Sequence, residues 1–232
     1  MLPKLPEMFY TRRYQGCYNR IMKITRFPQS CILIEKDAQK IVIDPGTPFL
    51  HTHKPEEIKD VAAVLYTHQH QDHYEPSIAD TLFRGGTAIY ANEATAQLIG
   101  GDRCKIIKDG DGFHVGGFEV RAYELPHCLL PDGSAGPQNT GYIIDDIFFH
   151  PGDGKEMQAA LQVDTVALPL IGPDISVREA FAFAGQVQAK LAIPIHYDLM
   201  GANIDVYKAW ADGSNLPFEF RVLADGESLE IT

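Results

Sequence analysis

The chain has 232 residues, 45% of them hydrophobic, which suits a single folded domain with a substantial core. Its formal net charge of −11 argues against a broad nucleic-acid surface, because phosphate-rich polymers bind basic patches. We find no secretory leader pattern and no apolar run of about 18 residues, so we expect a cytoplasmic protein without a membrane span.

The charge is distributed unevenly along the chain. Residues 1–27 contain six Lys or Arg residues against one Glu. We therefore expect a basic N-terminal extension over residues 1–21, ahead of a folded domain over residues 22–232. Such an arm could be solvated, dock on the acidic body, or contact a second copy of the chain, which leaves a homo-oligomer open. None of the four cysteines forms a CxxC pair, and we expect reduced thiols.

The first third of the sequence is typical of short strands. Residues 31–35 and 40–44 are strand-like runs joined by a tight connection. Residues 61–66 form a short continuous apolar run, which indicates a strand covered on both faces. That strand leads directly into a histidine-rich segment over residues 68–73.

Helical and strand patterns alternate after that segment. Helices are predicted over residues 77–84, 93–99, 155–161 and 176–190. Strands or hairpins are predicted over residues 88–90, 113–125, 140–150, 165–170, 192–195 and 218–231. Two packed sheets with helices outside would satisfy this pattern. Residues 131–139 have neither pattern and are the best candidate for a mobile loop.

The strongest chemical signal is His68-Gln69-His70-Gln71-Asp72-His73, directly after the buried strand. Imidazole and carboxylate are ligands that suit zinc, iron and manganese. On a loop, His68 and His70 can face one point while Asp72 and His73 face a neighbouring one, so one segment can serve two metals. The pair His51-Thr52-His53 lacks both a following acid and a preceding strand, and we expect it to be structural or exposed.

This segment matches the HxHxDH motif of the metallo-β-lactamase superfamily. Residues 22–35 and 41–46 resemble the opening strands of its metal-dependent hydrolase subgroup, which includes the ascorbate-6-phosphate lactonase. The resemblance spans roughly residues 22–231. It implies an α+β fold, the αβ/βα four-layer sandwich, with metals at one edge between the sheets.

The resemblance also implies which residues bind metal. His127, Asp153 and His196 each follow an apolar strand in the order that the family pattern expects. By resemblance, one metal is held by His68, His70 and His127, the other by Asp72, His73 and His196, and Asp153 bridges them. The implied cofactors are two divalent ions, zinc first, with manganese or iron as alternatives. Asp72 could also orient the nucleophile, as a catalytic residue.

One position departs from the family pattern. Relatives often have Gly-His-Ser where this chain has Pro28-Gln29-Ser30, so Gln29 replaces a histidine that could approach the site. His150 is expected to support the site or to pack beside it, and Cys128 to be structural. The difference at Gln29 prevents a direct transfer of a relative's substrate to this chain.

The expected activity is hydrolysis of a small-molecule ester, lactone or phosphodiester. A metal lowers the pKa of bound water towards about 7, and the resulting hydroxide would attack a carbonyl or phosphorus. Two alternatives stay open. One is an iron-dependent oxidoreductase on the same fold, similar to sulfur dioxygenases, and the other is a non-catalytic metal-binding protein.

Overall fold

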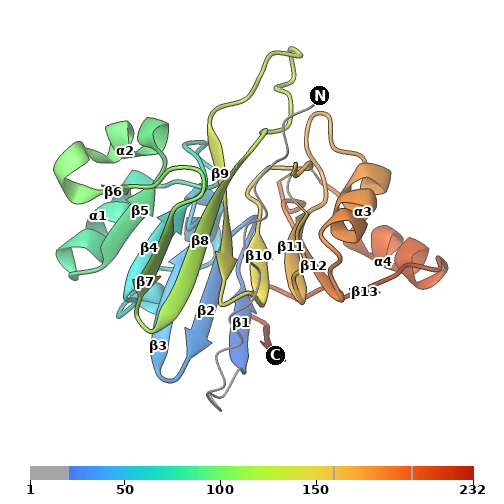
Figure 1. Cartoon of the computed structure of the whole chain (residues 1–232), viewed down its shortest axis with the longest axis horizontal. Helices are drawn as coiled ribbons and strands as arrows, with labels where there is room; N and C mark the ends of the chain where they lie inside the picture. Colours follow the sequence, from blue (N-terminus) through green and yellow to red (C-terminus); the bar gives the residue numbers. More distant parts are fainter. Residues whose placement is uncertain (1–20, 159, 200) are drawn as a thin grey trace, which may run out of the picture.

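The computed structural model describes residues 21–158, 160–199 and 201–232 (Figure 1). Of the expected basic extension over residues 1–21, all but Ile21 lies outside the described residues. The described strands form two seven-stranded sheets. None of the helices in this part of the chain combines the length and hydropathy that a bilayer crossing needs.

The first sheet has the strand order β14-β1-β2-β3-β4-β5-β6. Strands β14, β1, β2 and β3 pair antiparallel, whereas β3, β4, β5 and β6 run parallel. The strands are β1 (Met22–Arg26), β2 (Ile32–Lys36), β3 (Gln39–Ile43), β4 (Ala63–Tyr66), β5 (Ala88–Ala91), β6 (Lys105–Ile106) and β14 (Ser228–Ile231). The tight connection between β2 and β3 contains Asp37 and Ala38, which both have positive φ, as a two-residue hairpin loop requires.

The second sheet repeats this plan with the order β13-β12-β11-β10-β9-β8-β7. Strands β7, β8, β9 and β10 pair antiparallel, and β10, β11, β12 and β13 run parallel. The strands are β7 (Gly112–Val115), β8 (Phe118–Leu125), β9 (Asn139–Ile144), β10 (Phe148–His150), β11 (Thr165–Pro169), β12 (Leu191–Ile195) and β13 (Glu219–Phe220).

Helices cover the outer face of each sheet (Figure 1). The first sheet is flanked by α1 (Pro76–Arg84) and α2 (Glu93–Ile99), and the second by α3 (Val177–Gln186) and α4 (Ile204–Asp212). Short 3₁₀ helices η1 (Thr47–His51), η2 (Pro55–Ile58) and η3 (Gly101–Arg103) lie in the connections. The predicted αβ/βα four-layer sandwich is therefore confirmed.

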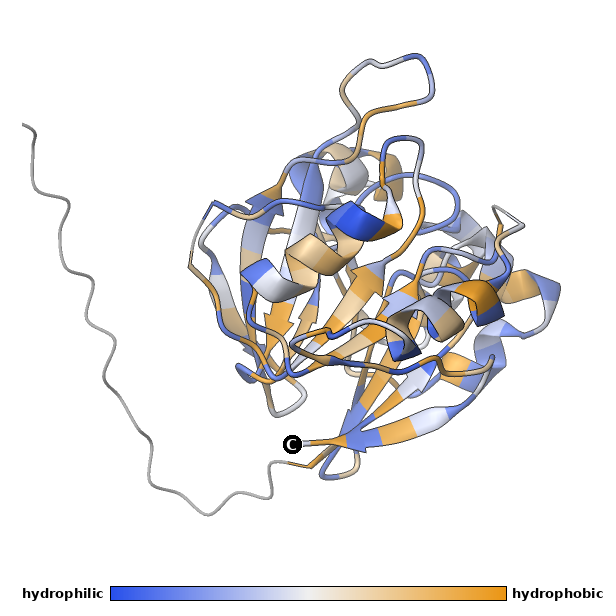
Figure 2. Ribbon diagram, turned by 90° about the vertical axis from the view of Figure 1, so that its right-hand side faces the viewer, coloured by the Kyte–Doolittle hydropathy of each residue, from blue (hydrophilic) through white to orange (hydrophobic). Residues whose placement is uncertain are grey.

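Side chains alternate between the two faces of each strand, and this produces three hydrophobic clusters: one between the sheets and one between each sheet and its helices. In β3, Ile41 and Ile43 join the cluster between the sheets, while Val42 faces the layer that contains α1 and α2. In β12, Ile193 joins the shared cluster and Ala192 faces the layer that contains α3. Figure 2 shows hydrophobic residues concentrated along the strands in the interior.

Two predicted elements are wrong. Residues 155–161 are not helical in the described residues. Their polar groups bond to other elements instead: Lys155 Nζ donates to Asp174, and the carbonyl of Met157 accepts from Gln186 of α3. The predicted strand pair over residues 218–231 does not form, because β13 pairs with β12 and β14 pairs with β1. The chain crosses between the sheets there, with Leu223 buried in the shared cluster.

The remaining helices and hairpins agree with the prediction apart from their ends. The predicted helix over residues 176–190 ends at Gln186, and Gln188 already has a positive φ of 49°. Asn92 caps α2 as expected, accepting a hydrogen bond from the backbone N–H of Thr95. Helix α4, capped by Asn203, was not predicted from the sequence.

Candidate metal centre

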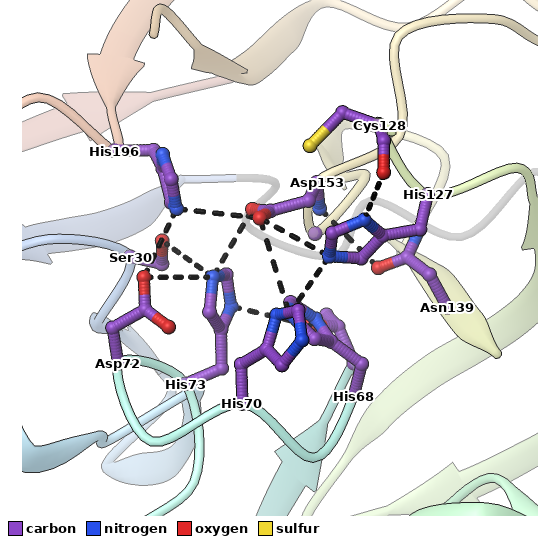
Figure 3. A network of polar contacts seen from close by, with 12 residues as sticks. Ser30, His68, His70, Asp72, His73, His127, Cys128, Asn139, Asp153 and His196 are labelled. Atoms are coloured by element: carbon purple, nitrogen blue, oxygen red, sulfur yellow. Dashed lines mark hydrogen bonds and ion pairs between the residues drawn. The ribbon is translucent and has the colours of Figure 1, made fainter. Parts of the chain in front are cut away.

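Seven predicted site residues meet at one edge of the sandwich, where four strands end (Figure 3). The segment over residues 68–73 follows β4, His127 follows β8, Asp153 follows β10 and His196 follows β12. Strands β8 and β10 are both antiparallel to β9, and β10 and β12 are both parallel to β11, so their carboxyl ends share an edge. The fold therefore brings together residues up to 128 positions apart in sequence.

The first group contains His68, His70, His127 and Asp153, whose donor atoms lie within 4.8 Å of one another. Nε2 of His68 lies 3.1 Å from Nδ1 of His70 and 3.3 Å from Nε2 of His127. Oδ2 of Asp153 lies 3.4 Å from Nε2 of His127. These atoms converge on one point between the four side chains.

The second group contains Asp72, His73 and His196. Oδ2 of Asp72 lies 3.0 Å from Nε2 of His196 and 3.8 Å from Nε2 of His73. Asp153 also faces this group, with Oδ1 3.0 Å from His73 and Oδ2 3.3 Å from His196. Its carboxylate thus contacts histidines of both groups.

These distances fit two cation sites. Two nitrogens bound to one tetrahedral zinc ion lie about 3.3 Å apart, given Zn–N bonds of about 2.0–2.1 Å. The separations from His68 to His70 and His127 are close to this value. Oδ1 of Asp153 is buried and receives no aligned hydrogen bond in the described part of the chain, although His73 lies beside it. Facing nitrogen atoms and an oxygen without a hydrogen bond are what a set of metal ligands presents.

The outer ring nitrogens fix three histidines in the tautomer that a metal requires. Each Nδ1 donates to an oxygen that can only accept, which leaves the Nε2 lone pair facing the centre. These hydrogen bonds run from His73 to Asp44 Oδ2 (2.7 Å), from His127 to the Cys128 carbonyl (2.5 Å) and from His196 to the Ile171 carbonyl (2.5 Å).

Asp44 orients two histidines from the end of β3. Its fully buried carboxylate accepts hydrogen bonds from His73 Nδ1, Thr67 N and the Thr67 hydroxyl. Oγ1 of Thr67 in turn lies 3.0 Å from Nδ1 of His68. Sequence reasoning treated Asp44 as part of an opening strand and missed this role. The sequence feature that could have indicated it is the position of Asp44, an acid directly after β3, the strand beside β4.

Two backbone positions show how tightly this edge is built. Gly152 has a φ of +59°, and a Cβ there would lie 2.1 Å from Oδ1 of Asn139. That same oxygen accepts a hydrogen bond from the backbone N–H of Asp153. His196 has a positive φ of 58°, a costly conformation for a residue with a side chain. In this conformation the His196 ring donates its Nδ1 hydrogen bond to the Ile171 carbonyl.

Gln29, the residue that departs from the family pattern, contacts the second group. Its side-chain Nε2 donates to Oδ2 of Asp72 at 3.0 Å. Its backbone carbonyl accepts from the N–H of His196, and its side-chain oxygen lies 3.4 Å from the N–H of Leu199. Gln29 is buried and has a positive φ of 64°. It therefore connects Asp72 to the segment that follows His196.

The electrostatics of the cluster keep the acid ionised. Burial would raise the pKa of Asp153, but the fields of His196 and His73 hold it well below its usual range. Burial, assisted by neighbouring His73, holds the pKa of His68 well below its usual range. Burial would lower the pKa of His73, His127 and His196, but the Asp153 carboxylate beside them outweighs this and raises it, so a metal ion would displace protons from these three imidazoles on binding.

Two further histidines, His150 and His53, lie outside the seven-residue cluster. His150 is buried, with Nε2 2.8 Å from the Ser30 carbonyl and Nδ1 accepting from the N–H of Gly152, so it supports the site as expected. His53 bonds to Glu57 and Asp225 away from the cluster. The segment over residues 131–139 passes beside the centre, since a Cβ on Gly136 would lie 2.2 Å from the His127 ring.

The comparisons with known proteins agree with this geometry. A family model described as the Beta-lactamase superfamily domain matches residues 23–196. Protein Rv0786c of Mycobacterium tuberculosis is 31% identical over 182 residues, covering 75% of this chain and 84% of its own length. A UPF0173 metal-dependent hydrolase of Rhizobium etli is 27% identical over 237 residues, covering 90% of this chain and 100% of its own length.

A solved structure shares the fold. Igni18, a metallo hydrolase from the archaeon Ignicoccus hospitalis, superposes with a TM-score of 0.70 at 19% identity, covering 90% of this chain and 98% of its own. Together, the match over most of the described domain, the two-sheet sandwich and the seven clustered side chains lead to one conclusion: the chain belongs to the metallo-β-lactamase superfamily.

Proposed function

We propose that the chain is a binuclear metal-dependent hydrolase that acts on a small molecule. His68, His70 and His127 would hold one divalent ion, Asp72, His73 and His196 the other, and Asp153 would bridge them. The observation that carries this proposal is the position of the Asp153 carboxylate, within 3.4 Å of histidines from both groups. A relative of similar length in Rhizobium etli is named a metal-dependent hydrolase, which agrees with it.

Two divalent ions in these groups would supply a hydroxide nucleophile near neutral pH and positive charge for the developing oxyanion. The role of the chain is to hold the ligands and to orient the nucleophile. Asp72 suits the orienting role because its Oδ2 is fixed by Gln29 Nε2 and faces His196. Burial would raise the pKa of Asp72, but His73 and His196 outweigh this and hold the pKa far below its usual range. Asp72 therefore stays ionised and can accept a hydrogen bond from the nucleophile.

A nucleophile from the protein is not needed for this chemistry. The thiol nearest in sequence to the ligands is Cys128, which is 1% exposed and belongs to the apolar cluster beneath α3. Esters, lactones and phosphodiesters are the bonds that an activated hydroxide would cleave. Compounds of all three classes are therefore to be tested.

The test is reversible metal depletion of the full chain. Protein treated with a chelator would be assayed against p-nitrophenyl butyrate, γ-butyrolactone and bis(p-nitrophenyl) phosphate, then again after addition of zinc, manganese or ferrous iron. We expect turnover of one class to disappear on depletion and to return with zinc or manganese. The same protocol on His70→Ala, with His114→Ala as the matched control on exposed β7, would link the effect to this centre.

Other outcomes would contradict the proposal. Activity that survives depletion would exclude a metal-dependent reaction. Recovery with iron alone, accompanied by oxygen consumption, would identify the oxidoreductase alternative. Full metal loading with no turnover of any class would indicate a non-catalytic metal-binding protein.

A further inference from the structure

A cavity of about 400 Å³ adjoins the second group of ligands. It is lined by Thr47, Pro48, His51, Gln71, Asp72 and Leu199. This volume lies in the range of small-molecule pockets, about 300–1,000 Å³. Because Asp72 belongs both to the cavity wall and to the candidate metal centre, a molecule in the cavity would reach the reacting groups.

One wall of the cavity is η1, which is fixed against the ligand loop. A Cβ on Gly46 would lie 2.2 Å from the backbone carbon and oxygen of Asp72, so only glycine allows this approach. The next residue, Thr47, donates its backbone N–H to the Gln71 carbonyl at 2.7 Å. The start of η1 is therefore held beside Asp72 by contacts along the backbone.

The geometry of a 3₁₀ helix then selects which side chains face the cavity. Residues three apart share a face in such a helix, so Pro48 and His51 lie together. Phe49 faces the other way and packs on Phe27 and His53. This separates the two histidines of the His51-Thr52-His53 pair: His53 is bonded to acids, whereas the side chain of His51 has no hydrogen-bond or ion-pair partner within the described ranges.

The opposite wall is Leu199, which is half exposed (50%) and follows His196 closely in sequence. Its backbone N–H lies 3.4 Å from the side-chain oxygen of Gln29, the residue that also bonds Asp72. Gln29 therefore connects the backbone of Leu199, in the apolar wall, to the candidate metal ligand Asp72. Pro48 and Leu199 give the cavity two apolar surfaces, and His51 gives it one polar group.

Among the described residues that line the cavity there is neither Lys nor Arg, so this wall offers no fixed positive side chain to an anionic group. The basic residue nearest in sequence to Gln29 is Arg26, which is 2% exposed, is paired with Asp198 and lies over the Tyr197 ring. The Thr47 hydroxyl donates to Glu75, which adds negative charge behind the wall. The two acids on this side of the centre, Asp72 in the wall and Glu75 behind Thr47, disfavour a phosphorylated substrate.

We propose that this cavity binds an uncharged ester or lactone, with Pro48 and Leu199 contacting its apolar part and His51 forming a hydrogen bond to it. This assignment rests on the proposed hydrolase function, and it excludes phosphorylated sugars and nucleotides as the preferred substrates.

The test separates binding from turnover in the zinc-loaded full chain. N-(4-nitrophenyl)butanamide serves as an uncharged, slowly hydrolysed probe for calorimetric binding, and bis(p-nitrophenyl) phosphate as the anionic comparison. We expect the amide to bind more tightly than the phosphodiester. Leu199→Asp should weaken amide binding at least about tenfold, because it replaces an apolar contact with a charge. The matched control is Leu98→Asp on exposed α2, which should change nothing.

His51 is tested by a pair of variants. His51→Ala should weaken amide binding about 3- to 10-fold, the range of one hydrogen bond, and raise KM for p-nitrophenyl butyrate with little change in kcat. His51→Gln, which keeps a donor, should restore part of the affinity. Metal content should equal that of the unsubstituted chain in both variants.

Tighter binding of the phosphodiester, or unchanged amide affinity in Leu199→Asp and His51→Ala, would overturn the assignment. Loss of metal in His51→Ala would move His51 into the metal centre and overturn it as well. Amide binding with the expected variant effects but no turnover of the ester, the lactone or the phosphodiester would support the cavity and contradict the proposed hydrolase function.

Discussion

The two halves of the molecule share one strand plan but contribute to the candidate centre in different ways. In the first half, β1–β6, four of the seven side chains lie within the seven residues that follow β4. In the second half, β7–β13, three side chains come from three separate loops, after β8, β10 and β12. One half supplies a local motif, and the other supplies single residues that only the folded sheet brings together.

The difference extends to the groups that orient the ligands. His73, in the first half, is oriented by the buried carboxylate of Asp44. His127 and His196, in the second half, are oriented by backbone carbonyls. A side-chain partner can be removed by substitution, whereas a carbonyl cannot, so the two halves differ in how they can be tested.

The largest expected effect comes from removing one ligand from each half. Asp153→Asn should reduce activity at least about 10³-fold, because it removes charge from both groups and a metal ion contributes several kcal/mol to transition-state stabilisation. His70→Ala should lose metal and activity together in the same way. Elemental analysis and kinetic assays would check both, with Asp146→Asn in the exposed β9–β10 turn as the control. Full activity in either ligand variant would refute its assignment.

Matched core substitutions compare how the halves stabilise the fold. Ile43 in β3 and Ile193 in β12 are both fully buried in the cluster between the sheets. We expect Ile43→Ala and Ile193→Ala each to lower the free energy of unfolding by about 2–5 kcal/mol. Urea denaturation measures both values. A loss below about 1 kcal/mol at one position would show that the shared core depends on one sheet only.

Asp44→Asn probes the side-chain support that only the first half has. It weakens the acceptor for His73 Nδ1 and for the Thr67 hydroxyl, so metal affinity should fall about 10- to 100-fold. Competition with a chromogenic chelator measures the affinity. Asp60→Asn is the control, since Asp60 also has a positive φ, of 61°, but lies outside the centre. Equal affinity in the two variants would exclude the orienting role of Asp44.

The smallest effect concerns His53, which links η2 to the crossing between the sheets. Burial would lower its pKa, but hydrogen bonds to Glu57 and Asp225 outweigh this and raise it. A raised folded-state pKa means that the stabilisation is fully present below the unfolded value of about 6.5 and is lost as pH rises through the folded value.

His53→Gln should therefore cost more stability at pH 5.5 than at pH 9, with a difference below about 1 kcal/mol. Thermal unfolding of both proteins at the two pH values measures this difference. A cost that is independent of pH would assign the role of His53 to packing on Phe27 and Phe49 alone.

The candidate ligands of the two halves also differ in how well the sequence alone predicts them. The contiguous segment over residues 68–73 is visible without a structure, because one loop gathers four ligand-type residues after an apolar strand. His127, Asp153 and His196 have no local signature, and their prediction depended on the order that the family resemblance supplies. Their proximity is a product of strand direction, which periodicity does not encode.

The errors have related physical causes. Residues 155–161 have helical composition, but their polar groups bond to Asp174 and to Gln186 of α3 instead of to one another. The strands over residues 218–231 have the pattern of a hairpin and nevertheless belong to different sheets. The role of Asp44 and the separation of His51 from His53 depend on contacts between elements, which the sequence pattern does not contain.

The central claim is the division of the cluster into two ion sites that share Asp153. The most direct measurement is the metal content per chain, by elemental analysis of protein purified without chelator, for the unsubstituted chain, His127→Ala and His196→Ala. We predict about two zinc or manganese ions for the unsubstituted chain and about one for each variant, because each substitution removes one ligand from one group. A single ion in the unsubstituted chain that either variant abolishes would contradict the two-site account, and no metal at all would refute the metal centre.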